Sequence, residues 1–153
     1  MPTKKILRRA TQGDVNGIVT LVDDAYGPYI ARMGRKPGPM LDDYRHVVEQ
    51  TEAFVVTEDE AIVGLLVMRK EEDDELLLIN VAVLPRRKGQ GIGKMLMTFC
   101  EQHALELGCP AVRLYTHQLM VENIEIYKKL GYRETHRATN DGFARVFMRK
   151  VVG

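Results

Sequence analysis

The amino-acid sequence predicts an α/β (α+β) fold, in which helices pack on one mixed β-sheet. Segments with a helical spacing of apolar residues alternate along the chain with short runs rich in Val, Ile, Leu and Phe. One run, residues 76–84, is apolar almost throughout, as in a strand covered on both faces. Turn residues separate most runs. We therefore expect about seven strands and about four helices in the order β-α-α-β-β-β-α-β-α-β-β.

The first fifty residues predict a strand, two helices and an irregular segment between them. Residues 4–11 are expected to form the first strand, and residues 14–25 a helix with one apolar face toward the sheet. That face consists of Val15, Ile18, Val19, Val22 and Tyr26. Residues 27–39 contain several Gly and Pro, which leaves room only for a turn at residues 29–33. Residues 42–50 predict a second, short helix.

The middle of the chain predicts a hairpin followed by the central strand of the sheet. Residues 54–57 and 62–69 read as two strands around the acidic turn 58–60. The acidic residues 71–75 predict a solvated connection to the central strand, residues 76–84.

The last third predicts two more helices and three strands. In order these are a helix over 92–107, a strand over 112–116, a helix over 119–130, and strands over 132–138 and 144–151. The turn Asn140-Asp141-Gly142 joins the last two strands as a hairpin. Because neither a linker nor an internal repeat divides the chain, we expect a single domain over residues 1–153.

Composition excludes several classes of function. With 22 basic and 21 acidic residues the net charge is +1, so nothing global indicates nucleic acid or a membrane surface as a partner. Residues 1–9 hold no apolar run like that of a signal peptide, and the chain has no segment of about 20 apolar residues. Two cysteines, Cys100 and Cys109, form no disulfide framework. A cytoplasmic location is expected.

The most informative segment is residues 81–94, VAVLPRRKGQGIGK, a strand, a proline and a glycine-rich turn that opens a helix. We call residues 88–94 the glycine turn. Glycine leaves backbone N–H groups free to converge on an anion at the positive end of a helix dipole. Arg86, Arg87, Lys88 and Lys94 add positive charge nearby. The pattern predicts a phosphate-binding turn, although a plain strand-to-helix turn with solvated basic residues is the alternative.

Two other phosphate-binding motifs fail on spacing. A Walker A loop has four residues between its first Gly and the Gly-Lys pair, here Gly93-Lys94, and Ser or Thr after the Lys, but this chain has Lys88 and Met95 at those two positions. A dinucleotide fingerprint needs a third glycine, but finds Lys94 or Leu96.

The turn resembles the signature of the GNAT superfamily: Arg or Gln, two residues, Gly, one residue, then Gly or Ala. Lys88-Gly89-Gln90-Gly91-Ile92-Gly93 matches it, with Lys88 in the place that is usually Arg or Gln. The resemblance implies a mixed, mostly antiparallel GNAT-like sheet and acetyl-CoA as cosubstrate. It implies that the diphosphate is held mainly by backbone amides of the glycine turn, Lys88, Gly89, Gln90, Gly91, Ile92, Gly93 and Lys94. It also implies that Val81, Ala82 and Val83 bind the pantetheine arm.

A second segment, ENIEIYKKLGY over residues 122–132, is similar to the family's helix that ends in Tyr, three residues, Gly and an aromatic residue. Tyr127 fills the tyrosine position, and the resemblance makes it our expected general acid for the leaving thiolate. Asn123 lies on the same helical face as Tyr127 and is expected to contact the cofactor.

The acceptor amine must lose a proton before it attacks, because an alkylammonium has no free lone pair. His117, at the end of a strand beside the cleft helix, is the expected base, and Glu122 is the alternative. The four histidines are scattered, so no metal is expected. Tyr26, Tyr29 and Tyr44, in or beside the irregular segment, are expected to line the acceptor pocket.

The expected function is therefore transfer of the acetyl group of acetyl-CoA to a primary amine, by direct attack in a ternary complex. The acceptor is expected to be a small-molecule or peptide amine, and the resemblance also allows a homodimer. A catalytically silent acyl-CoA sensor on the same fold and a nucleotide-binding module of another class are the alternatives.

Overall fold

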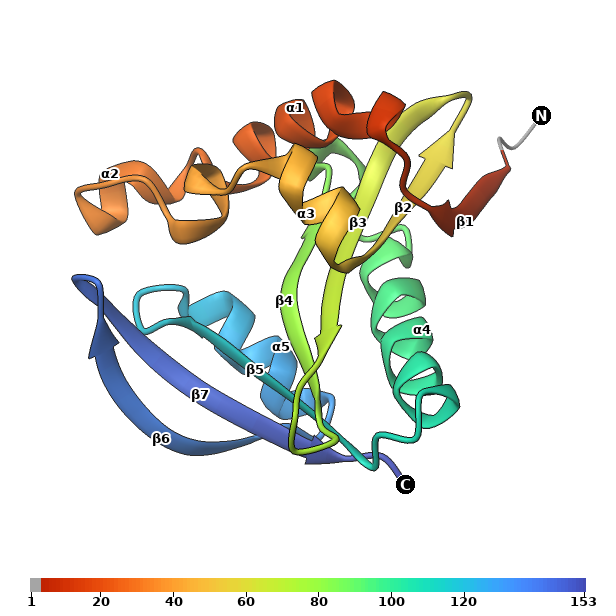
Figure 1. Cartoon of the computed structure of the whole chain (residues 1–153). Coiled ribbons are helices and arrows are strands. Elements are labelled where there is room, and N and C mark those ends of the chain that lie inside the picture. The colour runs from red at the N-terminus through yellow and green to blue at the C-terminus, as the bar shows by residue number, and fades with distance from the viewer. Residues whose placement is uncertain (1–3) are drawn as a thin grey trace.

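The computed structural model describes residues 4–153, so the first three residues of the expected domain lie outside it. Its centre is a seven-stranded sheet in the order β1-β2-β3-β4-β5-β7-β6 (Figure 1). The strands are β1 Lys5–Arg9, β2 Glu52–Glu58, β3 Ala61–Lys70, β4 Leu76–Val83, β5 Ala111–His117, β6 Arg133–Asn140 and β7 Phe143–Val151. All neighbours pair antiparallel except β4 and β5, which are parallel. The expected mixed, mostly antiparallel sheet is confirmed.

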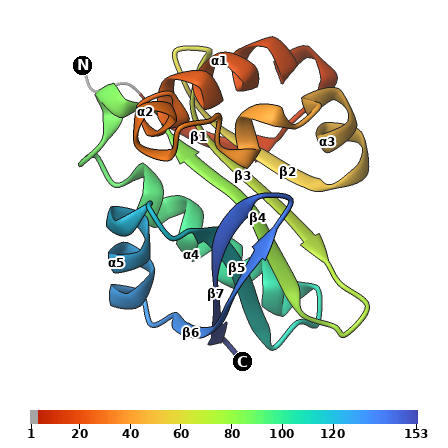
Figure 2. The same ribbon diagram turned by 90° about the vertical axis from the view of Figure 1, so that its left-hand side faces the viewer.

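Helices cover both faces of the sheet. They are α1 Val15–Tyr26, α2 Tyr29–Met33, α3 Tyr44–Gln50, α4 Ile92–Glu106 and α5 Val121–Lys129, with a 3₁₀ turn η2 over Gly38–Leu41 and another, η3, over Pro85–Arg87. The helices α1, α2 and α3 gather on one side of β3 and β4, whereas α4 packs on the opposite side (Figures 1 and 2). In the segment expected to be irregular, α2 occupies the residues 29–33 where a turn was expected, and η2 is an additional element.

The long helix α4 packs closely against β3 at Gly64. A Cβ atom at this position would lie 2.9 Å from Ile92 and 3.3 Å from Leu96, both buried on α4. The absence of a side chain therefore lets the helix approach the strand. This contact fixes the start of α4 above the end of β4.

The strands β4 and β5 pair over a short stretch and then part. The register joins Leu76, Leu77 and Leu78 to Val112, Arg113 and Leu114 in turn. Beyond Leu78, β4 continues to Val83 and β5 continues to His117 without pairing to each other. On its other edge β4 stays paired with β3 as far as Val83. The open edge of β4 leaves backbone hydrogen-bonding groups for another partner.

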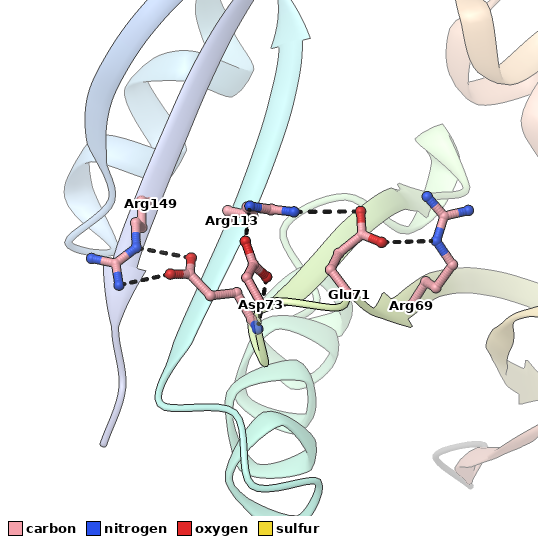
Figure 3. Close-up of polar contacts among 6 residues, drawn as sticks. Arg69, Glu71, Asp73, Arg113 and Arg149 are labelled. Atoms are coloured by element: carbon pink, nitrogen blue, oxygen red, sulfur yellow. Dashed lines mark hydrogen bonds and ion pairs between the residues drawn. The ribbon is translucent and has the colours of Figure 1, made fainter.

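Ion pairs join the closed end of this split. The β3–β4 connection carries Glu71 and Asp73, which pair with Arg113 of β5 at 3.5 and 2.7 Å (Figure 3). Glu75 accepts two hydrogen bonds of 2.9 and 3.0 Å from Arg149 of β7. The acidic composition of residues 71–75 predicted a solvated connection, but carboxylates of this segment form ion pairs with β5 and β7. Its carboxylates hold β4 beside β5 and β7 at the end opposite to the opening.

Candidate active site

The glycine turn follows η3 and begins α4 with left-handed backbone at Gly89 (φ 83°) and Gly91 (φ 84°). Residues other than glycine rarely adopt this conformation. A Cβ atom at either position would meet no atom within 4 Å, so the space above the turn is open. Gly91 is the N-cap of α4 and offers no capping side chain. The first turn of a 15-residue helix is thus left without a capping partner.

Most backbone N–H groups of the glycine turn have no partner. The N–H groups of Lys88 and Gln90 each make a long hydrogen bond of 3.3 Å, to the carbonyls of Pro85 and Arg87. Five others make no hydrogen bond to any residue of 4–153, and we call them the cofactor amides: Gly89, Gly91, Ile92, Gly93 and Lys94. Because they lie at the positive end of the α4 dipole, they are suited to hold an anion.

The basic residues around the turn are not all available to such an anion. Arg87 donates a hydrogen bond of 2.8 Å to Glu58, a buried carboxylate that also pairs with Lys5 at 3.2 Å. Lys88 and Lys94 are exposed and form no ion pair within the described part of the chain. The local positive charge is therefore smaller than the four basic residues of the sequence suggested.

The backbone of β4 presents alternate residues to the opening. The carbonyl of Val81 accepts a hydrogen bond of 3.1 Å from Tyr26 on α1, while the N–H of Leu84 bonds to Val63 of β3 at 2.9 Å. Because successive residues of a strand face opposite edges, Val83 shares the open side with Val81. Ala82 then directs its backbone toward β3. Of the three residues expected to bind a pantetheine arm, Val81 and Val83 face the open edge of β4 and Ala82 does not.

A cavity lies between the diverging strands and is closed by α2, η2, α5 and the β6–β7 hairpin. Five residues expected at the site from the sequence line it together: Tyr26, Val81, His117, Asn123 and Tyr127. Tyr29 and Tyr44 do not line the cavity, and neither does the glycine turn, which lies beyond the end of β4. The strand β4 therefore runs from the cavity to the cofactor amides, as a cofactor with a long arm requires.

Tyr127 on α5 lines the cavity with a hydroxyl that makes no hydrogen bond to residues 4–153. Its ring packs edge-on against Tyr132, with centroids 5.9 Å apart. Burial raises the pKa of Tyr127 well above its usual range, and the neighbouring Cys100 and Tyr29 add to the effect. The phenol is therefore protonated near neutral pH and can donate its O–H to a group in the cavity.

His117 also lines the cavity, at the end of β5. The backbone N–H of Leu119 donates a hydrogen bond of 3.1 Å to Nδ1 of this ring. Burial lowers the pKa of His117, and the charges of Arg145 and Arg35 lower it further. A neutral ring whose Nδ1 accepts a hydrogen bond carries its proton on Nε2. Such a ring offers the cavity a donor and has no free lone pair for an amine proton.

Glu122, the alternative base, lies outside the cavity. It pairs with Arg32 of α2 at 2.7 Å, and this hydrogen bond lowers the pKa of Glu122. Arg32 also donates to the carbonyl of Leu119 at 3.1 Å, so the pair links α2 to the start of α5. The contact joins the two sides of the cavity and holds the carboxylate of Glu122 outside it.

Asn80 is a site residue that the sequence reasoning missed. Its side chain is buried and lines the cavity, where its oxygen accepts a hydrogen bond of 2.6 Å from Tyr26. Its amide donates to the hydroxyl of Tyr44 at 3.1 Å, and that hydroxyl donates to the carbonyl of Pro39 at 2.6 Å. Tyr44 thus does not line the cavity but holds Asn80, which does. The sequence feature that could have identified Asn80 is its place as a polar residue in an otherwise apolar strand.

The described residues contain no group of three or more His, Cys, Asp or Glu side chains placed to hold a metal ion. Cys100 is buried on α4, and burial raises the pKa of its thiol to about 12, so it is protonated and poorly nucleophilic. No helix within residues 4–153 is long and apolar enough to cross a bilayer.

The split between the parallel strands β4 and β5, with open amides at the start of α4, agrees with the fold and the phosphate-binding turn that the resemblance to the GNAT superfamily implied. The model of the Acetyltransferase (GNAT) family matches residues 18–132. The chain therefore belongs to the GNAT family, and its cosubstrate is acetyl-CoA.

Individual relatives agree with this assignment. S-alkylcysteine N-acetyltransferase of Bacillus subtilis (strain 168) is 28% identical over 162 residues, covering 96% of this chain and 89% of the relative. The N-acetyltransferase YvbK of the same organism is 23% identical over 94 residues, a match that spans 61% of this chain but only 59% of YvbK. The PaiA N-acetyltransferase of Thermoplasma acidophilum, solved with coenzyme A, has the same fold. Its TM-score is 0.76 at 16% identity over 97% of this chain and 99% of that one.

Proposed function

We propose that this protein is an N-acetyltransferase that moves the acetyl group of acetyl-CoA directly to a primary amine while both are bound. The observation that carries the proposal is the set of five unpartnered cofactor amides at the start of α4. In this arrangement they bind the diphosphate, together with the exposed Lys88 and Lys94. The pantetheine arm then follows the open edge of β4 along Val83 and Val81.

The reaction takes place where the cavity meets the end of this arm. The amine nitrogen attacks the acetyl carbonyl carbon, the carbon–sulfur bond breaks, and the thiolate of coenzyme A leaves. Tyr127 donates its O–H toward the sulfur as negative charge develops there. Because the pKa of this phenol lies above that of a thiol, we assign it mainly to hydrogen bonding. A proton transferred from it to the sulfur is restored from solvent.

The proton lost by the acceptor amine needs a separate route. His117, expected as the base, suits this role poorly because Leu119 occupies its Nδ1. Glu122 is bound to Arg32. We therefore propose that the amine is deprotonated through water in the cavity. Asn123, on the same face of α5 as Tyr127, is proposed to contact the cofactor arm.

A small acceptor fits the cavity better than a polypeptide. The guanidinium of Arg35, after α2, lies 4.0 Å over the ring of Phe143 and contacts the carbonyl of Asp141 at 3.5 Å, so two loops meet beside the cavity. One similar protein is named for acetylation of S-alkylcysteine, a small amine. We propose a small-molecule acceptor.

The decisive experiment follows release of the free thiol from acetyl-CoA with a panel of amines. The proposal predicts thiol release that depends on amine and yields an equal amount of acetylated product. Binding of acetyl-CoA without turnover of any amine would instead indicate a silent acyl-CoA sensor.

A further inference from the structure

Arg145 of β7 is the only residue with a permanent charge among those that line the cavity. The other polar groups around it are hydroxyls, amides and the neutral ring of His117. A permanent charge in a site of this kind usually recognises an opposite charge on the ligand. Arg145 is therefore the first place to look for acceptor specificity.

Aromatic rings, and no carboxylate, hold this guanidinium. Its central carbon lies 4.5 Å from the ring centroid of Tyr115 and 5.5 Å from that of Phe143. Within residues 4–153 it makes neither a hydrogen bond nor an ion pair. By contrast, Arg149 on the same strand is bound to Glu75 by two hydrogen bonds. Arg145 keeps its N–H donors in a fixed place and unpaired, as a carboxylate site requires.

The surroundings of Arg145 are positive. Phe143 carries a second guanidinium, that of Arg35, at 4.0 Å from its ring centroid. The charges of both arginines help to lower the pKa of His117, after burial, so their field reaches the cavity. The carboxylate of Asp42 is near enough for its charge to interact with that of Arg145, but Asp42 is exposed and forms no ion pair with Arg145 among the described residues. An anion bound here would meet two guanidinium groups, and the carboxylate of Asp42 is not bonded to Arg145.

His117 adds a second donor beside the same aromatic residue. Its ring stands edge-on to Phe143, with centroids 6.3 Å apart, and its Nε2 carries the proton when Nδ1 accepts from Leu119. One carboxylate can accept from a guanidinium and from an imidazole N–H at once.

We propose that the acceptor is an amine that also carries a carboxylate, as an amino acid does, and that Arg145 binds this carboxylate with support from His117. The amine of the bound acceptor would then face the acetyl group near Tyr127. This inference rests on the proposed function and adds the chemical class of its substrate.

The test compares acceptors that carry a carboxylate with close analogues that lack this charge. Thiol release from acetyl-CoA is measured with methionine and methioninamide, with leucine and leucinamide, and with 6-aminohexanoate and hexylamine. At least one acid should exceed its uncharged counterpart by about tenfold or more in kcat/KM, since a lost hydrogen bond to a charged group has at least this effect. Whether an α- or an ω-amino acid is preferred would show how far the amine lies from the carboxylate.

Arg145→Gln should lower kcat/KM for the preferred acid by about tenfold or more, mainly through KM, and should change kcat/KM for its uncharged counterpart much less. Arg137→Gln is the matched control, because it removes the same charge from an exposed arginine that pairs with Glu134. Unchanged coenzyme A affinity in both variants shows that the fold is intact.

Two results distinguish failure of this inference from failure of the proposed function. Turnover of uncharged amines as fast as of acids, with Arg145→Gln equal to the wild type for both, would overturn this inference and leave the proposed function standing. A lack of thiol release with every amine would overturn the proposed function and this inference with it.

Discussion

The hydroxyl of Tyr26 donates a hydrogen bond of 2.6 Å to the side-chain oxygen of Asn80. This contact joins the last residue of α1 to β4 shortly after β4 has parted from β5. The amide of Asn80 continues the chain of hydrogen bonds to Tyr44 and from there to Pro39. A buried polar network of this kind is stable only when every member has its partner. It fixes the irregular segment above the cavity.

Tyr44→Phe should therefore lower the free energy of unfolding by about 1–3 kcal/mol, because Asn80 and Pro39 lose a buried partner. The variant should also raise the KM of the acceptor more than the dissociation constant of acetyl-CoA. Urea denaturation and steady-state kinetics measure the two effects. Tyr29→Phe is the control, because the hydroxyl of Tyr29 makes no hydrogen bond to residues 4–153. Equal stability of the two variants would contradict the role of the network.

Tyr127→Phe should reduce kcat by about a hundredfold, because the departing sulfur loses its O–H donor. The dissociation constant of acetyl-CoA should stay within about twofold, since the ring remains. Calorimetry and thiol release measure both quantities. The matched control is Tyr132→Phe, whose hydroxyl donates to Glu101 at 3.2 Å. If Tyr127→Phe turned over as fast as the wild type, Tyr127 would have no part in expelling the thiolate.

Gly89→Ala should weaken coenzyme A binding by about tenfold or more. A left-handed alanine costs about 1–2 kcal/mol, so the turn shifts and the cofactor amides no longer converge. Gly108→Ala is a close control, because Gly108 has φ 77° and an added Cβ meets nothing within 4 Å, yet it follows the far end of α4. Both variants should lose similar stability in thermal unfolding. Equal affinity for coenzyme A in the two would argue against binding by the turn.

The free energy of unfolding should decrease at acidic pH, in part because one ion pair remote from the site, Arg8–Asp14, is lost when Asp14 is protonated. Arg8 donates hydrogen bonds of 2.8 and 2.9 Å to the buried Asp14, and mainly through them lowers the pKa of Asp14 to about 2. Because the folded pKa lies below the unfolded value of about 3.9, this stabilisation is complete above that value. It is lost as the pH falls toward 2, and it amounts to about 2 kcal/mol.

Urea denaturation between pH 2 and 6 measures this effect. Asp14→Asn should remove most of that slope, whereas Asp24→Asn, at an exposed position of α1, should retain it. A slope unchanged by Asp14→Asn would show that other carboxyl groups control acid unfolding.

Local patterns along the chain predicted most of the fold. The order of strands and helices followed from the periodicity of apolar residues and from turn residues, because both depend only on residues close together in the sequence. Details of burial were less accurate. Val19, assigned to the buried face of α1, is 41% exposed, while Leu21 is 1% exposed, because tertiary packing decides which part of a helix faces the sheet.

For the site too, the sequence predicted local features better than contacts between distant segments. The glycine turn was found because its three glycines lie close together in the sequence, and two of them, Gly89 and Gly91, adopt left-handed backbone. Arg145 and Tyr115 belong to strands far apart along the chain, and only the pairing of β5 with β7 brings them together. The proton position of His117 depends on one backbone N–H in the loop after β5. Contacts between distant segments could not be deduced from spacing.

Nuclear magnetic resonance of ¹⁵N-labelled protein tests the central claim most directly, because it observes the cofactor amides one by one. Coenzyme A should shift the amide signals of Gly89 and residues 91–94, whereas pantetheine, which lacks the diphosphate, should shift those of Val81 and Val83 and leave the glycine turn unmoved. The signal of Gly108 should not respond to either. Cofactor amides that stay in place at saturating coenzyme A would contradict the account.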